Sequence, residues 1–107
     1  MVSSEAWRIY ERFDRETTRI LGEQWIRSID SIGANIAEGF GRYHFLDKNK
    51  FNYNARGSLL EALHWIKLLH ERGTISYEEM DALDDRLSKL HHQLNAYIKS
   101  TKTQIGK

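Results

Sequence analysis

The sequence predicts an all-α protein, an up-down helical bundle of three long helices plus a short N-terminal helix. Apolar residues repeat at helical spacing through most of the 107 residues, which is typical of amphipathic helices. The chain contains no proline, the residue that most strongly interrupts a helix. A chain of this length holds one hydrophobic core, so residues 1–107 are expected to form a single domain.

The first helix is expected over about residues 4–13, with Ser3 or Ser4 as its cap. Its apolar side is formed by Ala6, Ile9, Tyr10 and Phe13. This helix is much shorter than the others, so part of the bundle is expected to stay uncovered. Trp7, Trp25 or apolar neighbours would then be exposed, and self-association would bury them.

The second helix is expected over about residues 15–40, with Asp14 as the N-cap and two glycines, Gly39 and Gly41, ending it. One apolar seam contains Ile26, Ile29, Gly33, Ile36 and Phe40. Glycine inside a helix costs about 1 kcal/mol relative to alanine. We therefore expect another helix to approach closely at Gly33.

The third helix is expected over about residues 47–72, and Gly73 stands in the position that ends many helices. Its seam contains Phe51, Ala55, Ser58, Ala62, Trp65 and Leu69. The loop that follows is short, so the next helix should lie antiparallel beside this one.

The fourth helix is expected over about residues 77–100, because Ser76 and Glu79 have the spacing of a capping box. Its seam contains Met80, Leu83, Leu87, Leu90, Leu94 and Tyr97. Acidic side chains occupy its first turns and basic ones its last, which either complements the helix dipole or adds a basic surface for RNA. The tail after Ser100 is polar and is expected to fray.

The composition excludes several classes of protein. Without cysteine, the chain has no disulfide framework and no thiolate metal site. No apolar run approaches the ~20 residues of a membrane span, and the start lacks the pattern of a signal peptide. We therefore expect a cytoplasmic protein with no membrane partner. The net charge of +1 means that any nucleic-acid binding must depend on a local patch.

Three segments resemble one known family, the four-helix-bundle proteins encoded inside 23S rRNA intervening sequences. The most specific segment is S-I-G-A-N-I-A-E-G-F-G-R, Ser31 to Arg42. F-D-R-E-T-T-R-I-L-G-E-Q, Phe13 to Gln24, is similar to the start of the family's second helix. A-R-G-S-L-L-E, Ala55 to Glu61, is similar to its third-helix motif. The resemblance covers roughly residues 13–100.

This family is in turn similar to accessory proteins of diversity-generating retroelements, which form ring-shaped barrels of bundles and associate with RNA and a reverse transcriptase. By analogy, the resemblance implies a homo-oligomer, expected as a pentamer, with a basic surface for nucleic acid. The chain departs from the family in its shorter first helix and its nearly neutral charge. The resemblance implies a role in fold and assembly, rather than catalysis, for six residues: Arg27, Asn35, Glu38, Gly39, Ser58 and Glu61.

Polar residues at helical spacing support two interpretations. Arg27, Ser31, Asn35, Glu38 and Arg42 follow one side of the second helix, and Asn54, Ser58 and Glu61 follow the third. They could line a polar active site, or they could form an interhelical hydrogen-bond network. The network is favoured, because a catalytic site also needs a nucleophile–base pair or a metal. Its predicted members are Arg27, Asn35, Glu38, Ser58 and Glu61.

The sequence does not predict a metal, a cofactor or an enzyme. Glu61 and His64 form one E-x-x-H pair, whereas di-iron bundles need two copies and two further carboxylates. His91 and His92 are adjacent, so they point to different sides of their helix and cannot both bind an ion inside the bundle.

The segment from Arg42 to Tyr53 alternates cations with aromatic rings, the combination that binds looped or single-stranded RNA. Lys48 and Lys50 also lie in the first turn of a helix, where the dipole disfavours positive charge. The predicted contact residues are Arg42, Tyr43, His44, Lys48, Lys50, Tyr53 and Arg56. The alternative is a solvated loop whose rings fold into the core.

Two functional hypotheses follow. The first is a non-enzymatic oligomer that binds RNA or a nucleoprotein partner. The second is a protein–protein scaffold or adaptor with no nucleic-acid role, which would bind its partner through the incompletely covered apolar face.

Overall fold

The computed structural model describes residues 2–106, and every regular element in that range is helical. The elements are α1 (Val2–Tyr10), α2 (Arg15–Thr17), the π-helical segment η1 (Thr18–Gly22), α3 (Glu23–Phe40), α4 (Phe45–Glu71) and α5 (Tyr77–Ile105). The segments α2, η1 and α3 follow one another without a gap, so they form one continuous helix over residues 15–40. Counted in this way, residues 2–106 contain four helices, and the all-α prediction is confirmed.

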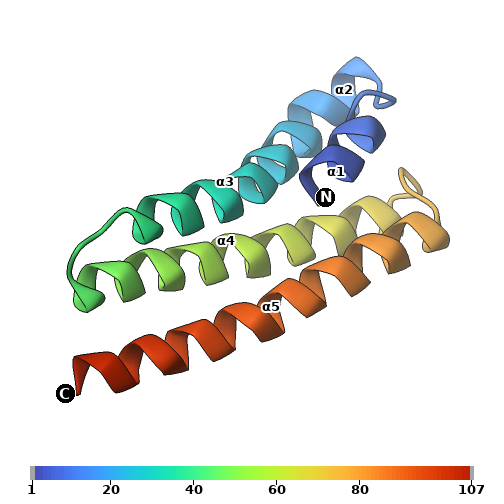
Figure 1. Ribbon diagram of the computed structural model, residues 1–107. Coiled ribbons are helices and arrows are strands. Elements are labelled where there is room, and N and C mark those ends of the chain that lie inside the picture. The colour runs from blue at the N-terminus through green and yellow to red at the C-terminus, as the bar shows by residue number, and fades with distance from the viewer. Residues whose placement is uncertain (1, 107) are drawn as a thin grey trace.

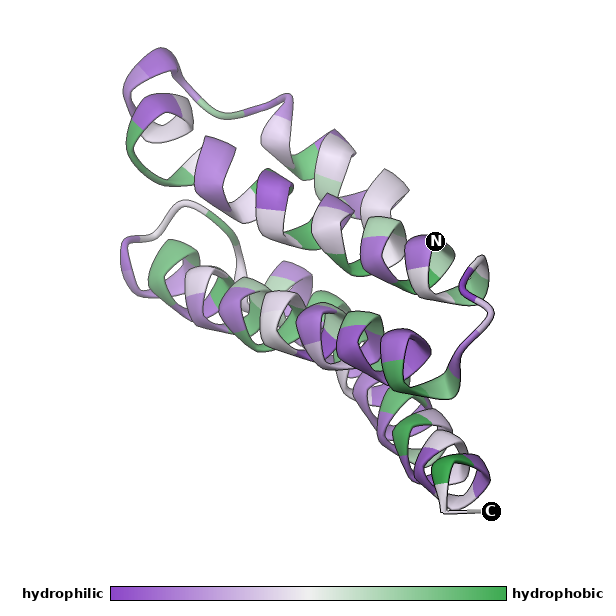
Figure 2. Ribbon diagram, turned by 90° about the vertical axis from the view of Figure 1, so that its left-hand side faces the viewer, coloured by the Kyte–Doolittle hydropathy of each residue, from purple (hydrophilic) through white to green (hydrophobic). Residues whose placement is uncertain are grey.

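The chain forms an elongated body of 51 × 22 × 19 Å. Figure 1 shows the chain turning back after α3 and again after α4, so that α4 lies beside α3 and α5 lies beside α4. The short helix α1 packs against α3 and α5. Hydrophobic and hydrophilic segments alternate along the helices in Figure 2, as expected where each helix buries one side. No helix within residues 2–106 is long and apolar enough to cross a membrane.

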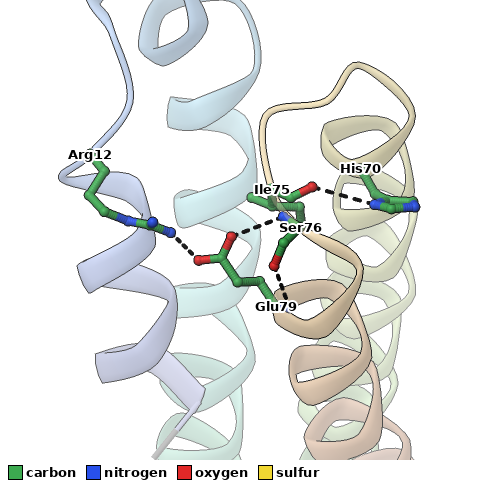
Figure 3. Close-up of polar contacts among 5 residues, drawn as sticks. All are labelled: Arg12, His70, Ile75, Ser76 and Glu79. Atoms are coloured by element: carbon green, nitrogen blue, oxygen red, sulfur yellow. Dashed lines mark hydrogen bonds and ion pairs between the residues drawn. The ribbon is translucent and has the colours of Figure 1, made fainter.

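The predicted helix caps are present. The side chain of Asp14 accepts a hydrogen bond from the Thr17 N–H, at 2.7 Å. Gly73 adopts a φ of 75°, the left-handed conformation that favours glycine after a helix. Ser76 and Glu79 form both hydrogen bonds of the capping box, at 2.9 and 3.0 Å, as Figure 3 shows.

The two capping carboxyl groups, Asp14 and Glu79, have pKa values below their ordinary ones. The hydrogen bond from the Thr17 N–H lowers the pKa of Asp14. Burial acts to raise the pKa of Glu79, but the hydrogen bond from the Ser76 N–H and the ion pair with Arg12 together outweigh burial and lower it. Both carboxyl groups therefore prefer to be charged in the folded protein.

Helix α1 lies on the half of the bundle that contains the α4–α5 loop. Ion pairs connect α1 and the turn that follows it to α5 at two points, Glu5 with Arg86 and Arg12 with Glu79. Gly22 of η1 lets the end of α1 and the turn after it pack closely on this segment, because a Cβ there would stand 3.0 Å from the Tyr10 ring and 3.1 Å from the Phe13 ring. The rings of Phe13 and Trp25 stack at 5.9 Å between centroids.

The hydrophobic core is thick under α1 and narrow beyond it. Its large cluster includes Trp25, Leu59, Ile66 and Leu87, and Ala6 of α1 packs into it. A second cluster near the α3–α4 turn has only three buried members, which are Ala55, Leu94 and Ile98. The bundle is therefore completed by four helices at one end and built from three at the other.

The close approach expected at Gly33 occurs instead at Gly39. Apart from its chain neighbours and the backbone of its own helix, no atom that the structure describes lies within 4 Å of where a Cβ on Gly33 would stand. A Cβ on Gly39 would stand 2.9 Å from the Cβ of Phe51 and 3.3 Å from the carbonyl oxygen of Lys48. The glycine of the signature segment that brings α3 against α4 is thus Gly39.

Several predicted boundaries and seams also need correction. The first helix ends at Tyr10 rather than 13, and the last continues to Ile105 instead of fraying after Ser100. At the end of α5 the buried positions are Ile98 and Thr101, whereas Tyr97 is exposed. Trp25, expected among the exposed side chains, is fully buried, but Trp7 is 48% exposed as expected.

Candidate nucleic-acid interface

The turn between α3 and α4 pairs cations with aromatic rings across the two helices. The guanidinium of Arg42 lies 4.9 Å from the ring centre of Phe51. The ammonium of Lys48 lies 5.6 Å from the ring centre of Phe40, the last residue of α3. Both distances fall in the range of cation–π attraction. The predicted interleaving of cations and rings is therefore a spatial arrangement as well as a sequence pattern.

Lys48 has a structural use in this turn. Its Nζ donates a hydrogen bond to the carbonyl oxygen of Phe40, at 3.4 Å. Carbonyl groups at a helix C-terminus lack intrahelical partners and carry partial negative charge, so a lysine is favourable there. A lysine is unfavourable near the N-terminus of α4, but Lys48 is used there because its side chain caps the C-terminus of α3.

Lys50 has no comparable partner. Its side chain is exposed and forms no ion pair or hydrogen bond with any other residue in the described range. Arg42, in contrast, also pairs with Glu38 at 2.9 Å, which offsets part of its charge. Of the predicted lysines, Lys50 is the one available to bind a phosphate.

Two tyrosines with different surroundings flank the turn. Tyr43 is 91% exposed, and its only aromatic neighbour within residues 2–106 is the adjacent His44, edge-on at 5.2 Å. Tyr53 is partly covered by two cations, with Arg56 at 4.9 Å and Lys102 at 5.6 Å from its ring centre. Tyr43 is therefore the ring with a free face for stacking.

Lys102 is a member of this surface that sequence reasoning missed. It comes from the last turns of α5, which the fold places beside the first turns of α4 (Figure 1). A second link between these helices is the hydrogen bond from Arg56 to the Asn95 side chain, at 3.0 Å. The basic side chains in the last turns of α5 were visible in the sequence. Only the fold shows that these turns lie beside the α3–α4 turn.

Charge is unevenly distributed along the molecule. Residues 34–60 and 90–106, which form this end of the bundle, contain only two acidic side chains, Glu38 and Asp47. Their six basic side chains are Arg42, Lys48, Lys50, Arg56, Lys99 and Lys102. This end therefore carries a net charge of +4, although the whole chain carries +1. Together these two segments are the basic end of the bundle.

Two buried asparagines hold the basic end together. The side chain of Asn49 donates to the carbonyl oxygen of Ile98 on α5, at 3.3 Å, and accepts from the side chain of Asn52, at 3.1 Å. Asn52 is only 1% exposed. This polar connection between α4 and α5 was not predicted, because amides look like solvent-facing residues in a sequence.

The five residues of the predicted polar network are not brought together in the described part of the chain. Asn35 donates to the Ser31 carbonyl within α3, Glu38 pairs with Arg42, and Glu61 accepts from the Trp65 indole within α4. Ser58 is half-buried, and Arg27 is exposed. Their interactions are local, because Glu38 and Glu61 project from the bundle. A role for them in assembly stays a prediction.

Residues 2–106 hold no group of three or more His, Asp or Glu side chains placed to bind a metal ion. Glu61 of the single E-x-x-H pair is exposed and accepts a hydrogen bond from Trp65, at 3.1 Å. The arrangement offers cationic and aromatic contacts.

The family model described as "23S rRNA-intervening sequence protein" matches residues 1–96. The chain belongs to this family. A solved structure of a protein with unknown function from the S23 ribosomal protein family of Bacteroides thetaiotaomicron is similar, with a TM-score of 0.74. The identity is 21%, and the match covers 92% of this chain and 99% of that one, which supports the fold. No curated protein matches the chain by sequence.

Proposed function

We propose that this protein is a non-enzymatic, up-down helical bundle that self-associates and binds RNA, alone or within a nucleoprotein, in the cytoplasm. The observation that carries the proposal is the basic end, where a net charge of +4 coincides with an exposed tyrosine. Cations follow a phosphate backbone and exposed rings stack on unpaired bases, so the two together favour looped or single-stranded RNA.

Self-association would strengthen this binding. A single patch with few free cations binds RNA weakly, but copies of the patch in a ring act together through a high effective concentration. Exposed apolar side chains could be buried in contacts between subunits. Phe40 is 73% exposed and Trp7 is 48% exposed. The pentamer implied by the resemblance is the expected form, and light scattering should report a mass well above the 12.6 kDa of one chain.

The experiment compares two single charge reversals on α4. Lys50→Glu lies in the basic end, whereas Lys67→Glu lies near the opposite end of the same helix. Both lysines are exposed and form no ion pair within residues 2–106. Both variants change the net charge equally and should fold equally well, which circular dichroism would check.

At low salt, Lys50→Glu should weaken binding to a structured RNA at least tenfold in a ring of several copies, and Lys67→Glu should have little effect. Equal effects of the two variants would mean that binding follows net charge rather than this surface. If the parent binds no RNA at low salt, the scaffold function takes its place. The exposed Phe40 and Leu46 side chains would then be the surface for a protein partner.

A further inference from the structure

A groove of 510 Å³ runs between the first turns of α4 and the last turns of α5. Its apolar lining comes from Leu46, Tyr53 and Ile105. Its polar lining includes Lys50 and Asn54 from α4 and Lys102 from α5. No acidic side chain within residues 2–106 lines it. An apolar floor between two lysines is therefore open to a ligand that is flat, apolar on its faces and anionic on its flanks.

The apolar lining is unusually accessible for a bundle. Leu46 is 70% exposed, and Tyr53 and Ile105 are each 37% exposed. Leu46, Lys50 and Tyr53 follow one another at helical spacing, so they form a single stripe along α4. A stripe of this kind normally packs on another helix, whereas here its members stay exposed.

We propose that this groove holds one unpaired base of a bound RNA, with the flanking phosphates on Lys50 and Lys102. This inference rests on the RNA-binding function proposed above and specifies its ligand. The base would lie against Leu46 and Ile105, which would shield its apolar faces from water. The exposed amide of Asn54 both donates and accepts hydrogen bonds, so it can contact the edge of the base.

Charge complementarity selects this occupant over a protein segment. Lysine stands on both sides of the groove, one from each helix, and Arg56 and Lys102 both lie against the Tyr53 ring. A base brings its own pair of phosphates at the spacing of the backbone, whereas an apolar peptide would bring no anion to pair with Lys50 and Lys102, which form no ion pair within residues 2–106. The volume also falls within the ~300–1,000 Å³ of ordinary small-ligand sites, so one base fits.

The inference predicts which RNA binds best. Bases in a duplex are stacked and paired, so they cannot enter a groove on a helix pair. A hairpin with a single bulged nucleotide can present one base together with its two phosphates. The ligand class is therefore RNA with an unpaired nucleotide next to a helix.

The test uses three hairpins of equal length: fully paired, with one bulged nucleotide, and with an abasic residue at the bulge. Fluorescence anisotropy at low salt gives their dissociation constants with the full-length protein. The bulged hairpin should bind about tenfold more tightly than the abasic one, because stacking and burial of one base are worth roughly that much. Equal affinity for the bulged and abasic hairpins would overturn the inference and leave the proposed function standing. No binding to any hairpin would overturn both.

Variants of the groove provide the second arm. Leu46→Ala/Ile105→Ala should remove the preference for the base while keeping the weaker, salt-dependent binding to the abasic hairpin. Leu60→Ala, at an exposed position farther along α4, is the control and should keep the preference. A double variant that changes the oligomeric mass but keeps the preference would show that the groove contacts a second copy of the chain, and the inference would be wrong.

Discussion

Replacing Gly39 with alanine tests the contact between α3 and α4 that shapes the basic end. An added Cβ would stand 2.9 Å from the Cβ of Phe51 and 3.3 Å from the Lys48 carbonyl oxygen. Neither atom belongs to the flexible end of a side chain, so the two helices must move apart. Overpacking of this kind costs about 1–3 kcal/mol, and the better helix propensity of alanine offsets about 1 kcal/mol. We expect a net destabilisation of up to about 2 kcal/mol.

Gly33→Ala is the matched control on the same helix. The space around Gly33 is open within the described residues, so only the gain in helix propensity applies. This variant should be more stable than the parent by about 0.5–1 kcal/mol. Urea unfolding followed by circular dichroism measures both free energies, and thermal unfolding should show shifts of opposite sign, about 4–8 °C for each kcal/mol.

The signs of the two stability changes show which glycine lies at the close approach of α3 to α4. If Gly39→Ala is as stable as Gly33→Ala, α3 and α4 do not approach as closely as described. If Gly33→Ala is instead destabilised at concentrations where the protein is oligomeric, another subunit contacts Gly33, and the expected close approach occurs between chains.

Three other changes test separate parts of the structure. Asn49→Ala should lower the free energy of unfolding by about 1–3 kcal/mol, because it removes the hydrogen bond from α4 to the Ile98 carbonyl and leaves the buried Asn52 amide without its acceptor; an unchanged urea midpoint would contradict this. Ser76→Ala should cost about 1 kcal/mol through loss of the cap on α5, measured in the same way, and Ser76→Asp should retain most of the stability. Lowered pKa values of Asp14 and Glu79 mean that their stabilisation is complete above their ordinary values of 3.8 and 4.5 and is lost as the pH falls through the lowered ones. The melting temperature should therefore drop on acidification below about pH 4, and less so in Asp14→Asn, which keeps a capping acceptor but cannot titrate.

The elements that depend on local chemistry could be predicted from the sequence. Asp14, Gly73 and the Ser76–Glu79 pair mark helix ends because their hydrogen bonds and backbone angles involve residues a few positions away. The helical repeat of apolar residues likewise determines the number and approximate length of the helices. Neither signal needs knowledge of how the helices pack.

Features that depend on packing between helices could not be predicted in the same way. Glycine spacing alone does not distinguish Gly33 from Gly39, because the difference lies in where Phe51 of α4 comes to rest. Asn49 and Asn52 occupy buried positions of α4. Their helical spacing with Ala55 indicates burial, but polar side chains are ordinarily expected on the surface. A buried amide is recognisable only when its partner, here the Ile98 carbonyl, is known.

The candidate site was predicted in part. The segment from Arg42 to Tyr53 does gather cations and rings, but the structure assigns different tasks to them. Lys48 caps α3, Arg42 pairs with Glu38, and Lys50 stays free. Lys102 joins them only through the pairing of α4 with α5, a contact between residues far apart in the sequence.

The salt dependence of RNA binding tests the central claim most directly. The dissociation constant of the parent for a bulged hairpin is measured at increasing salt concentration, together with that of Lys50→Glu. Binding through phosphate contacts at the basic end predicts that the logarithm of the association constant falls steeply and linearly with the logarithm of the salt concentration. Loss of each engaged Lys50 should reduce the magnitude of this slope by about 1. A slope near zero, or the same slope for parent and variant, would contradict the claim that this surface binds RNA.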